Sequence, residues 1–419
     1  MGDGAVDVLI VGAGAAGAAC ADELRDRGHT GSIMLIGREA DAPYHRPDVS
    51  KAYLRGSRSR EDSLLRPPAH WSQAGIELLT RVSAMKLDCA ARTVKLSDRR
   101  EITFGQALLA TGANVRRLRV DGMSLTGVHH LRALANADAL REDVEGAAAV
   151  VIVGGSYLAC EVAASLTEMG RAVTMVMTEE VPLADGFGPR AGEFFAGLLR
   201  EHGVAMVCGD GIARLDARPG RGDEPRPRVG RVVTESGVEL DADLVVMATG
   251  AVPDVMLARA AGLELGVTGG VACSSRLETS APGVWAAGDV CEYESSLHGG
   301  PVRIEHWEVA AAQGRAVAAS MLGQGRVFDE VPYFWSDLAD WCKVEYVGAG
   351  AGRDGEVVRG SLEAGDFTVF QLHGDRVVGA LTVGREDDLI HAARLLHRRE
   401  GLGSRVEALG DLSVDLAAL

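Results

Sequence analysis

Two segments of this chain share one plan: an apolar run, a turn that contains glycine, and a stretch that is rich in alanine. The first has VDVLIV at residues 6–11, GAGAAG at 12–17 and a predicted helix at 18–27. A nearly continuous run of Val, Ile and Leu is typical of a parallel strand that is buried on both faces. Glycines in the turn let backbone N–H groups at a helix N-terminus approach a pyrophosphate. This segment therefore predicts a dinucleotide-binding fold.

An acidic residue stands where such a fold needs one. A second apolar strand is predicted at residues 32–36, and it leads into Gly37, Arg38 and Glu39. In dinucleotide-binding folds an acid at this place accepts hydrogen bonds from the adenosine ribose. We expect Glu39 to be that acceptor.

The same plan begins again 142 residues later. A strand is predicted at 150–153, a helix at 160–169 and a further strand at 172–177, and the motif ATGA at 110–113 recurs at 248–251. In this second copy Ser156 and Ala159 replace the second and third glycines of the pattern. The repeat predicts either two bound nucleotides or one nucleotide and a degenerate second fold.

The length and the remaining patterns predict the domain organisation. With 419 residues, of which 47% are hydrophobic, the chain is long enough for two or three domains. Further along we expect a loop out of a hairpin at 216–231, strands at 283–290, 343–347, 367–372 and 377–383, and helices at 309–322 and 387–399. The predicted fold class is α/β, with two doubly wound dinucleotide-binding domains, 1–114 with 251–328 and 115–250, followed by a C-terminal α+β domain, 329–419.

Charge and cysteine content disfavour several classes of protein. A net charge of -16 disfavours nucleic acid or an anionic membrane as a partner. The seven cysteines lie at least 18 residues apart, so we expect buried thiols and neither a metal site nor a redox pair. No apolar run approaches membrane-spanning length. We expect a cytoplasmic protein.

Three longer motifs carry a family resemblance. They are PYHRPDVSKAYL at 43–54, RIEHW at 303–307 and VPYFWSD at 331–337. In this order the chain resembles, over nearly its whole length, the FAD-dependent pyridine-nucleotide reductases that serve ferredoxins and rubredoxins. The resemblance implies an enzyme that moves electrons from NAD(P)H through FAD to a small acidic [2Fe-2S] or similar ferredoxin, which in turn serves an oxygenase.

The resemblance also implies site residues. Lys51 and Glu161 are implied as a catalytic pair beside the flavin. The implied FAD-binding residues are Gly12, Gly14, Ala16, Gly17, Arg38, Glu39, Arg46, Lys51, Val82, Ala110, Thr111, Gly112, Arg132, Asp289, Trp307 and Trp335. The implied NAD-binding residues are Gly154, Ser156, Tyr157, Glu161 and Gly250.

The second turn departs from the family pattern, and two functions stay open. Ser156 adds a side chain where a nucleotide phosphate should approach, and Met177 stands where the ribose-binding acid is expected. NADPH preference is not supported, and NADH should bind more weakly than usual unless Glu179 bends back toward the turn. The alternative to a ferredoxin reductase is therefore an FAD flavoprotein with a degenerate NAD site that acts as an oxidase, a substrate dehydrogenase or a redox-sensing interaction protein.

Overall fold

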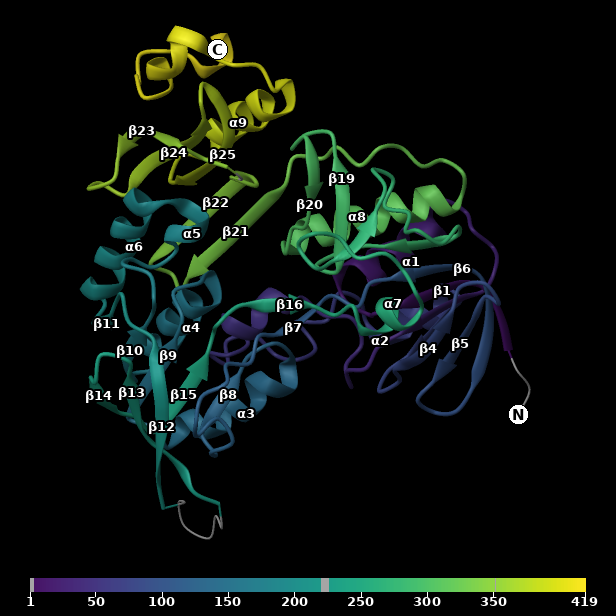
Figure 1. Ribbon diagram of the computed structural model, residues 1–419, viewed down its shortest axis with the longest axis horizontal. Helices are drawn as coiled ribbons and strands as arrows, with labels where there is room; N and C mark the ends of the chain where they lie inside the picture. The colour runs from purple at the N-terminus through teal and green to yellow at the C-terminus, as the bar shows by residue number, and fades with distance from the viewer. Residues whose placement is uncertain (1–3, 220–225, 351) are drawn as a thin grey trace. The chain divides into compact units, whose positions relative to one another are not determined.

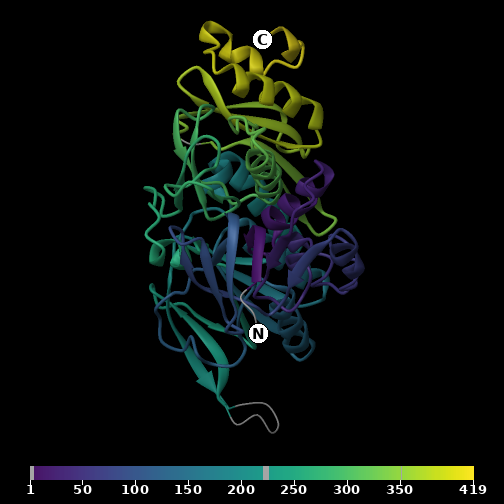
Figure 2. The ribbon, with the colours of Figure 1, turned by 90° about the vertical axis from the view of Figure 1, so that its right-hand side faces the viewer.

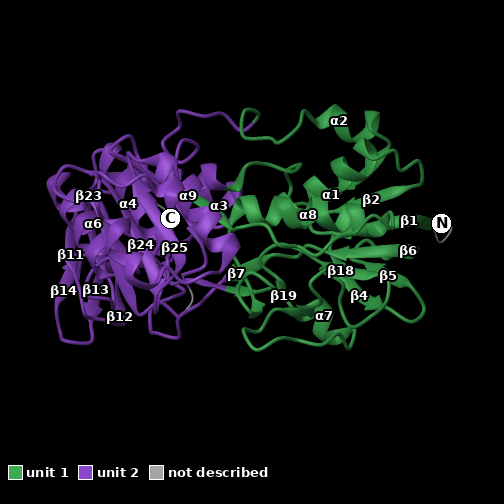
Figure 3. Ribbon diagram, turned by 90° about the horizontal axis from the view of Figure 1, so that it is seen from above, with its two compact units in different colours: residues 1–46, 61–114, 252–334 green, residues 47–60, 115–251, 335–419 purple. Residues whose placement is uncertain are grey.

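The computed structural model describes residues 4–219, 226–350 and 352–419 (Figure 1). These residues form two compact units, coloured separately in Figure 3. Unit 1 contains Met1–Arg46, Glu61–Asn114 and Val252–Phe334, and unit 2 contains Pro47–Arg60, Val115–Ala251 and Trp335–Leu419. The second predicted nucleotide-binding fold and most of the C-terminal part therefore lie in one unit. The partition into three domains stays a prediction.

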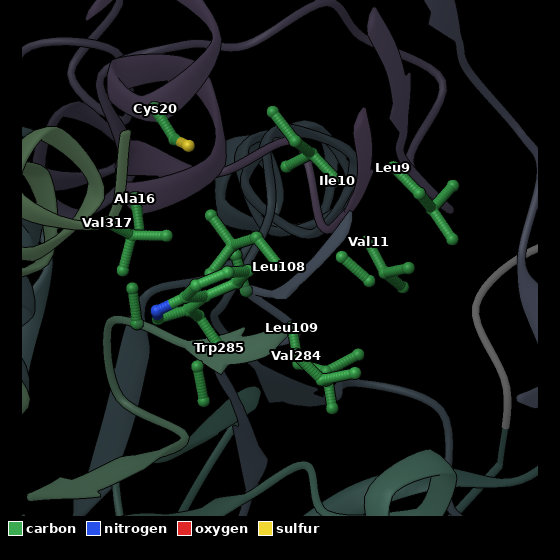
Figure 4. Packing of buried hydrophobic residues seen from close by; sticks show 14 of the residues in the cluster. Leu9, Ile10, Val11, Ala16, Cys20, Leu108, Leu109, Val284, Trp285 and Val317 are labelled. Carbon is green, nitrogen blue, oxygen red and sulfur yellow. The ribbon is translucent and has the colours of Figure 1, made fainter. Parts of the chain in front are cut away.

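The core of unit 1 is a seven-stranded sheet with β1 (Gly4–Val11) at its centre. β1 runs parallel to β2 (Ile33–Ile36) on one side and to β6 (Glu101–Leu109) on the other, and its last four residues are buried. The prediction of a buried parallel strand is thus confirmed. Figure 4 shows the packing around it, with Leu9, Ile10 and Val11 of β1, Ala16 and Cys20 of the following helix, Leu108, Leu109, Val284, Trp285 and Val317.

Two helices of unit 1 pack closely against each other. α1 (Ala15–Asp26) starts three residues before the predicted helix, because Gly14 already has the extended backbone of an N-cap. α8 (Trp307–Met321) crosses it at Gly314, where an added Cβ would lie 2.1 Å from the Ala16 carbonyl oxygen. Only glycine allows this approach.

The other elements of unit 1 complete the sheet and add a smaller one. The remaining strands of the large sheet are β3 (Ile76–Leu79), β4 (Ala84–Asp88), β5 (Thr93–Leu96) and β18 (Val284–Ala286), which runs parallel to the end of β6. The smaller sheet contains β17 (Val271–Cys273), β19 (Cys291–Ser295) and β20 (Gly300–Val302). The short helices are α2 (Pro68–Gln73) and α7 (Met256–Ala260), and β7 (Ala113–Val115) pairs with β16 (Ala251–Pro253).

Unit 2 repeats the plan of unit 1 around a five-stranded parallel sheet. The strand order is β11 (Ala205–Val207), β10 (Ala172–Val176), β9 (Ala149–Val153), β15 (Leu244–Met247) and β8 (Val128–His130). The helices are α3 (Leu134–Glu145), α4 (Tyr157–Glu168), α5 (Ala184–Phe187) and α6 (Pro189–Glu201). α4 begins at Tyr157 and not at the predicted residue 160, because Ser156 caps its first turn.

A hairpin leaves this sheet, as the sequence predicts, but its loop is shorter than predicted. β12 (Ile212–Arg218) pairs antiparallel with β13 (Arg228–Thr234), and β14 (Glu239–Asp241) adds a third strand (Figure 2). The predicted loop at 216–231 was wrong at both ends, because the ladder continues to the pair Arg218 and Arg228. The middle of the predicted loop, 220–225, lies outside the described residues.

The C-terminal part forms a five-stranded sheet with a helix packed on it. The sheet order is β21 (Tyr333–Leu338), β22 (Cys342–Gly348), β25 (Arg376–Val383), β24 (Asp366–His373) and β23 (Gly355–Ser361). α9 (Glu386–Arg398) contacts β25 and β22. Among the residues that the structure describes, the 3-10 helices are η1 (Arg46–Ser50), η2 (Gly403–Leu409) and η3 (Leu416–Ala418). Among the described helices, none is long and apolar enough to cross a membrane.

Candidate functional site

The first glycine turn, in unit 1, is shaped by direct backbone contacts. Gly12 has φ +118°, and a Cβ on it would lie 2.0 Å from the Ala110 carbonyl oxygen. A Cβ on Gly17 would lie 1.9 Å from the Gly12 carbonyl oxygen. At Gly14, the N-cap of α1, an added Cβ would meet nothing within 4 Å. The turn is therefore tight on its inner side and open at the helix N-terminus, where N–H groups can bind a phosphate.

The predicted ribose acceptor, Glu39, is held in its ionised form. Arg46 donates to Glu39 Oε1 at 2.7 Å, and the Tyr44 hydroxyl donates to Oε2 at 2.6 Å. Burial opposes ionisation, but the charge and hydrogen bond of Arg46 outweigh it and lower the pKa of Glu39. Because a carboxylate can accept about four hydrogen bonds, it can still accept from a ribose hydroxyl.

Arg38 faces other partners. Its guanidinium donates to Asp254 at 2.9 Å and to Asn114 at 2.7 Å. Arg38 therefore ties the end of β2 to Asp254. Three more of the predicted residues contact the same segments. Val82 N donates to the Gly37 carbonyl, and the Thr111 hydroxyl donates to the Asp254 carbonyl. Gly112, which has φ +70°, accepts from Asp254 N.

A second segment of unit 1 approaches the same turn. A Cβ on Gly288 would lie 3.4 Å from Ala310 and 3.5 Å from Ala16, so the Gly288-Asp289 segment passes close to both α1 and α8. The charge of Asp289 acts on both Arg46 and His306. Asp289 therefore lies near the groups that surround Glu39.

His306 and Trp307 form the start of α8. Burial lowers the pKa of His306 to about 4, so its imidazole is neutral at neutral pH. Trp307 is the first residue of the helix, and its ring meets His45 edge-on with 5.1 Å between ring centroids. The helix N-termini, the glycine turn and Glu39 together fit a dinucleotide such as FAD.

The second glycine turn, in unit 2, repeats the inner side of the first. Gly154 has φ +123°, and a Cβ on it would lie 2.4 Å from the Ala248 carbonyl oxygen, as Gly12 faces Ala110. Ala159 is fully buried at the third position. The Ser156 hydroxyl accepts from Ala159 N at 3.4 Å and donates to the Ala248 carbonyl at 3.2 Å. Ser156 thus uses its hydroxyl to cap α4, where Gly14 leaves the helix N-terminus open.

Glu179 bends back toward this turn. The Cβ that Gly155 lacks would lie 3.0 Å from Met177 Sδ and 3.3 Å from Glu179 Oε2. Met177 directly follows β10 and is 2% exposed, and its N–H donates to the Val207 carbonyl. The Glu179 carboxylate therefore stands against the turn, two residues after the position where the ribose-binding acid was expected.

A buried ion pair lies in unit 2 beside the start of α4. Lys51 Nζ lies 2.5 Å from Glu161 Oε1, and both side chains are less than a tenth exposed. This pairing, implied by the resemblance, is confirmed. The Lys51 ammonium also lies 4.9 Å from the centre of the Trp335 ring.

Two serines missed by sequence reasoning complete the cluster. Ser50 Oγ donates to Glu161 Oε2 at 2.5 Å, and Ser336 Oγ donates to Oε1 at 2.6 Å. Both serines stand next to predicted residues, Lys51 and Trp335, inside recognised motifs. Next in sequence, Asp337 has its pKa raised by burial, with Lys51 opposing the shift.

Three predicted residues have other surroundings. The Tyr157 ring packs edge-on against Phe187, with 5.0 Å between ring centroids. Gly250 has φ +92°, and its carbonyl accepts from Arg116 N at 2.9 Å. Arg132 is half-buried two residues after β8. In the described part of the chain, no group of three His, Cys, Asp or Glu residues could hold a metal ion.

Two family models match the chain. One is pyridine nucleotide-disulphide oxidoreductase, over residues 6–314, and the other is reductase C-terminal, over residues 333–419. Over 412 residues the chain is 34% identical to rhodocoxin reductase of Rhodococcus erythropolis, covering 98% of this chain and 94% of that protein. Over 415 residues it is 34% identical to putidaredoxin reductase of Pseudomonas putida, covering 98% and 96%. The crystal structure of the covalent putidaredoxin reductase-putidaredoxin complex superposes with a TM-score of 0.91 at 33% identity, covering 98% of this chain and 97% of that chain.

Proposed function

This chain belongs to the pyridine nucleotide-disulphide oxidoreductase family, whose members use FAD and a pyridine nucleotide, and from that premise we propose that it passes electrons from NADH to a small iron-sulfur ferredoxin. The observation that carries the proposal is the similarity to two named redoxin reductases over 98% of the chain, C-terminal part included. Bound FAD would supply the chemistry, since a flavin accepts a hydride and releases electrons singly.

We assign FAD to the turn of unit 1. Gly12 and Gly17 bring the backbone close, Gly14 leaves the N-terminus of α1 open to phosphate, and Glu39 takes the adenosine ribose. Arg46 keeps that carboxylate ionised. The remaining FAD contacts and the catalytic role of Lys51 and Glu161 stay predictions that rest on the family resemblance.

We assign NADH to the turn of unit 2, with Glu179 as the ribose acceptor. Its carboxylate against Gly155 would accept from the 2'-hydroxyl of NADH and repel the 2'-phosphate of NADPH. Ser156 opposes tight binding, because its hydroxyl already caps the helix N-terminus that would meet the pyrophosphate.

A thiol mechanism is disfavoured at Cys20, Cys160 and Cys342. Burial raises the pKa of Cys20 and of Cys160, and it raises the pKa of Cys342 to about 12. A thiol, and not the nucleophilic thiolate, is the stable form of each near neutral pH. The flavin is therefore proposed as the redox group.

The partner we propose is an acidic [2Fe-2S] ferredoxin that serves an oxygenase. Because the chain carries a net charge of -16, an acidic partner would need a local positive surface. Arg116, Arg117 and Arg119 are all exposed and offer one such surface. A cytoplasmic location stays a prediction.

An anaerobic stopped-flow titration tests the assignment. We expect NADH to bleach the oxidised flavin band rapidly and with saturation, and NADPH to do so at much higher concentration. Glu179→Gln should raise the apparent Kd for NADH by about one to two decades, because one charged hydrogen bond is lost, and should narrow the preference over NADPH. Glu180→Gln is the neighbouring control.

The second candidate function is a flavoprotein with a degenerate NAD site, and the capping by Ser156 favours it. It predicts no bleaching by millimolar NADH while dithionite still reduces the flavin. If NADH does bleach it, addition of candidate ferredoxins to the reduced protein then tests the electron acceptor.

A further inference from the structure

Glu161 is the meeting point of three parts of unit 2 that are far apart in sequence. Ser50 and Lys51 lie at the end of η1 and just beyond it, Glu161 lies in the second turn of α4, and Ser336 lies in β21, 175 residues after Glu161. Lys51 and Ser336 share one carboxylate oxygen, and Ser50 binds the other. All four side chains are buried.

A buried carboxylate of this kind depends on its donors. Removing a carboxylate from water is costly unless it is paired and its oxygens are hydrogen-bonded. A lysine alone has a long flexible stem and offers a point charge without a fixed direction. Two hydroxyls, one on each oxygen, fix the plane of the Glu161 carboxyl group and thereby the position of the Lys51 ammonium over Trp335.

We infer that Ser336 is a positioning residue for the Lys51–Glu161 pair, and that through it the C-terminal part of the chain takes part in electron transfer from NADH. Ser50 does the same at the other oxygen. The inference rests on the proposed function and on the proposed catalytic role of the pair. It goes beyond both because it assigns a task to a residue outside the two nucleotide-binding turns.

A neighbouring serine provides a matched control. Ser165 is fully buried one helical turn after Glu161, and its hydroxyl donates to the Ser50 carbonyl at 2.6 Å while accepting from Arg55. It therefore ties α4 to the segment of Ser50 and Arg55 without touching the carboxylate. Ser165→Ala should disturb packing as much as Ser336→Ala does.

The test is the rate of flavin reduction by NADH in purified, FAD-containing protein, measured by stopped flow. Ser336→Ala should lower the limiting rate about tenfold, the typical effect of losing a hydrogen bond to a charged group, and leave the apparent Kd for NADH within twofold. Ser165→Ala should change the limiting rate less than twofold, and Ser336→Thr, which keeps the hydroxyl, should restore it.

A double-mutant cycle separates positioning from general packing. In a Glu161→Gln background, Ser336→Ala should have little further effect, because the carboxylate it positions is gone. If Ser336→Ala lowers the limiting rate of flavin reduction by the same factor in the wild-type and Glu161→Gln backgrounds, the inference is overturned. If the Ser336→Ala protein does not retain flavin, Ser50→Ala can replace it in the double-mutant cycle, because Ser50 donates to the other carboxylate oxygen of Glu161.

The outcomes also distinguish the inference from its premises. If NADH fails to reduce the wild-type flavin, the proposed function is wrong and the inference falls with it. If Glu161→Gln reduces as fast as wild type, the catalytic pair is wrong. If Glu161→Gln is slow and Ser336→Ala is not, only the inference is wrong.

Discussion

At the scale of single residues, the two nucleotide-binding turns follow the same glycine pattern, but the atoms that surround equivalent positions differ. Gly17 and Ala159 occupy the same place in it, yet a Cβ on Gly17 would strike the Gly12 carbonyl, whereas Ala159 is accommodated and fully buried. The motif predicts that a turn is present. It does not predict which glycine is indispensable, because that depends on the local distance between helix and strand.

Gly17→Ala should destabilise unit 1 and empty it of flavin. The new Cβ would lie 1.9 Å from a carbonyl oxygen, and overpacking of this kind costs about 1–3 kcal/mol or more. Flavin absorbance per protein and the thermal unfolding midpoint measure the effect. Gly14→Ala is the control for protein packing, because its Cβ would meet no protein atom within 4 Å, and in flavin-free protein it should leave the unfolding midpoint nearly unchanged.

Ser156→Gly should strengthen the binding of NADH. The change removes the hydroxyl that caps α4 and frees the helix N-terminus, as at Gly14 in the first turn. We expect the apparent Kd for NADH to fall by several-fold, at a stability cost of only a few tenths of a kcal/mol, since glycine is a tolerated N-cap. Titration of flavin reduction measures it, and weaker binding by the variant would show that the Ser156 hydroxyl contacts the nucleotide.

At the scale of elements, strands that are buried on both faces were the easiest to predict. β1, β9 and β10 follow from their apolar runs alone. β23 was missed because it is an edge strand with five of its seven residues polar or glycine, and β21 because its aromatic residues were interpreted as a motif. The sequence could not predict that Ser336 donates a hydrogen bond to Glu161, because this contact depends on how β21 packs against α4.

One element links the C-terminal sheet of unit 2 to the nucleotide turn. Leu183 N, just before α5, donates to the Gly155 carbonyl, and Arg353 donates to the carbonyls of Ala184 and Gly186. Gln371 donates to Gly186 as well. The second turn is therefore supported from the C-terminal sheet.

Arg353→Ala should weaken NADH binding without loss of FAD. Two hydrogen bonds to α5 disappear, so the segment that holds Gly155 becomes more mobile, and we expect the apparent Kd for NADH to rise about threefold to tenfold. Arg376→Ala, which removes an exposed arginine of β25, is the control. An unchanged Kd would mean that Leu183 alone fixes the turn.

At the scale of the whole molecule, His306 in unit 1 and Asp243 in unit 2 should respond to acid in different pH ranges. In unit 1, burial lowers the pKa of His306 from 6.5 to about 4, so its contribution is complete above pH 6.5 and is lost as the pH falls toward 4. In unit 2, burial opposes ionisation of Asp243, but the N–H groups of Ala148 and Ala149 and the charge of Arg218 outweigh it and lower its pKa. The contribution of Asp243 is therefore complete above pH 3.8 and is lost only below that value.

Acidification should therefore affect His306, and with it the retention of flavin, before it affects Asp243. Burial also lowers the pKa of His130 in unit 2, so unit 2 too loses some stability as the pH falls below 6.5. Between pH 6.5 and 4, the temperature at which flavin fluorescence appears should fall by several degrees or more, since about 1 kcal/mol shifts a midpoint by roughly 2–4 °C in units of this size. His306→Gln should flatten this slope because it removes the titrating group, whereas Asp243→Asn should leave it unchanged and alter only the unfolding seen by circular dichroism below pH 4. A slope that survives His306→Gln would place the acid sensitivity of unit 1 in another group.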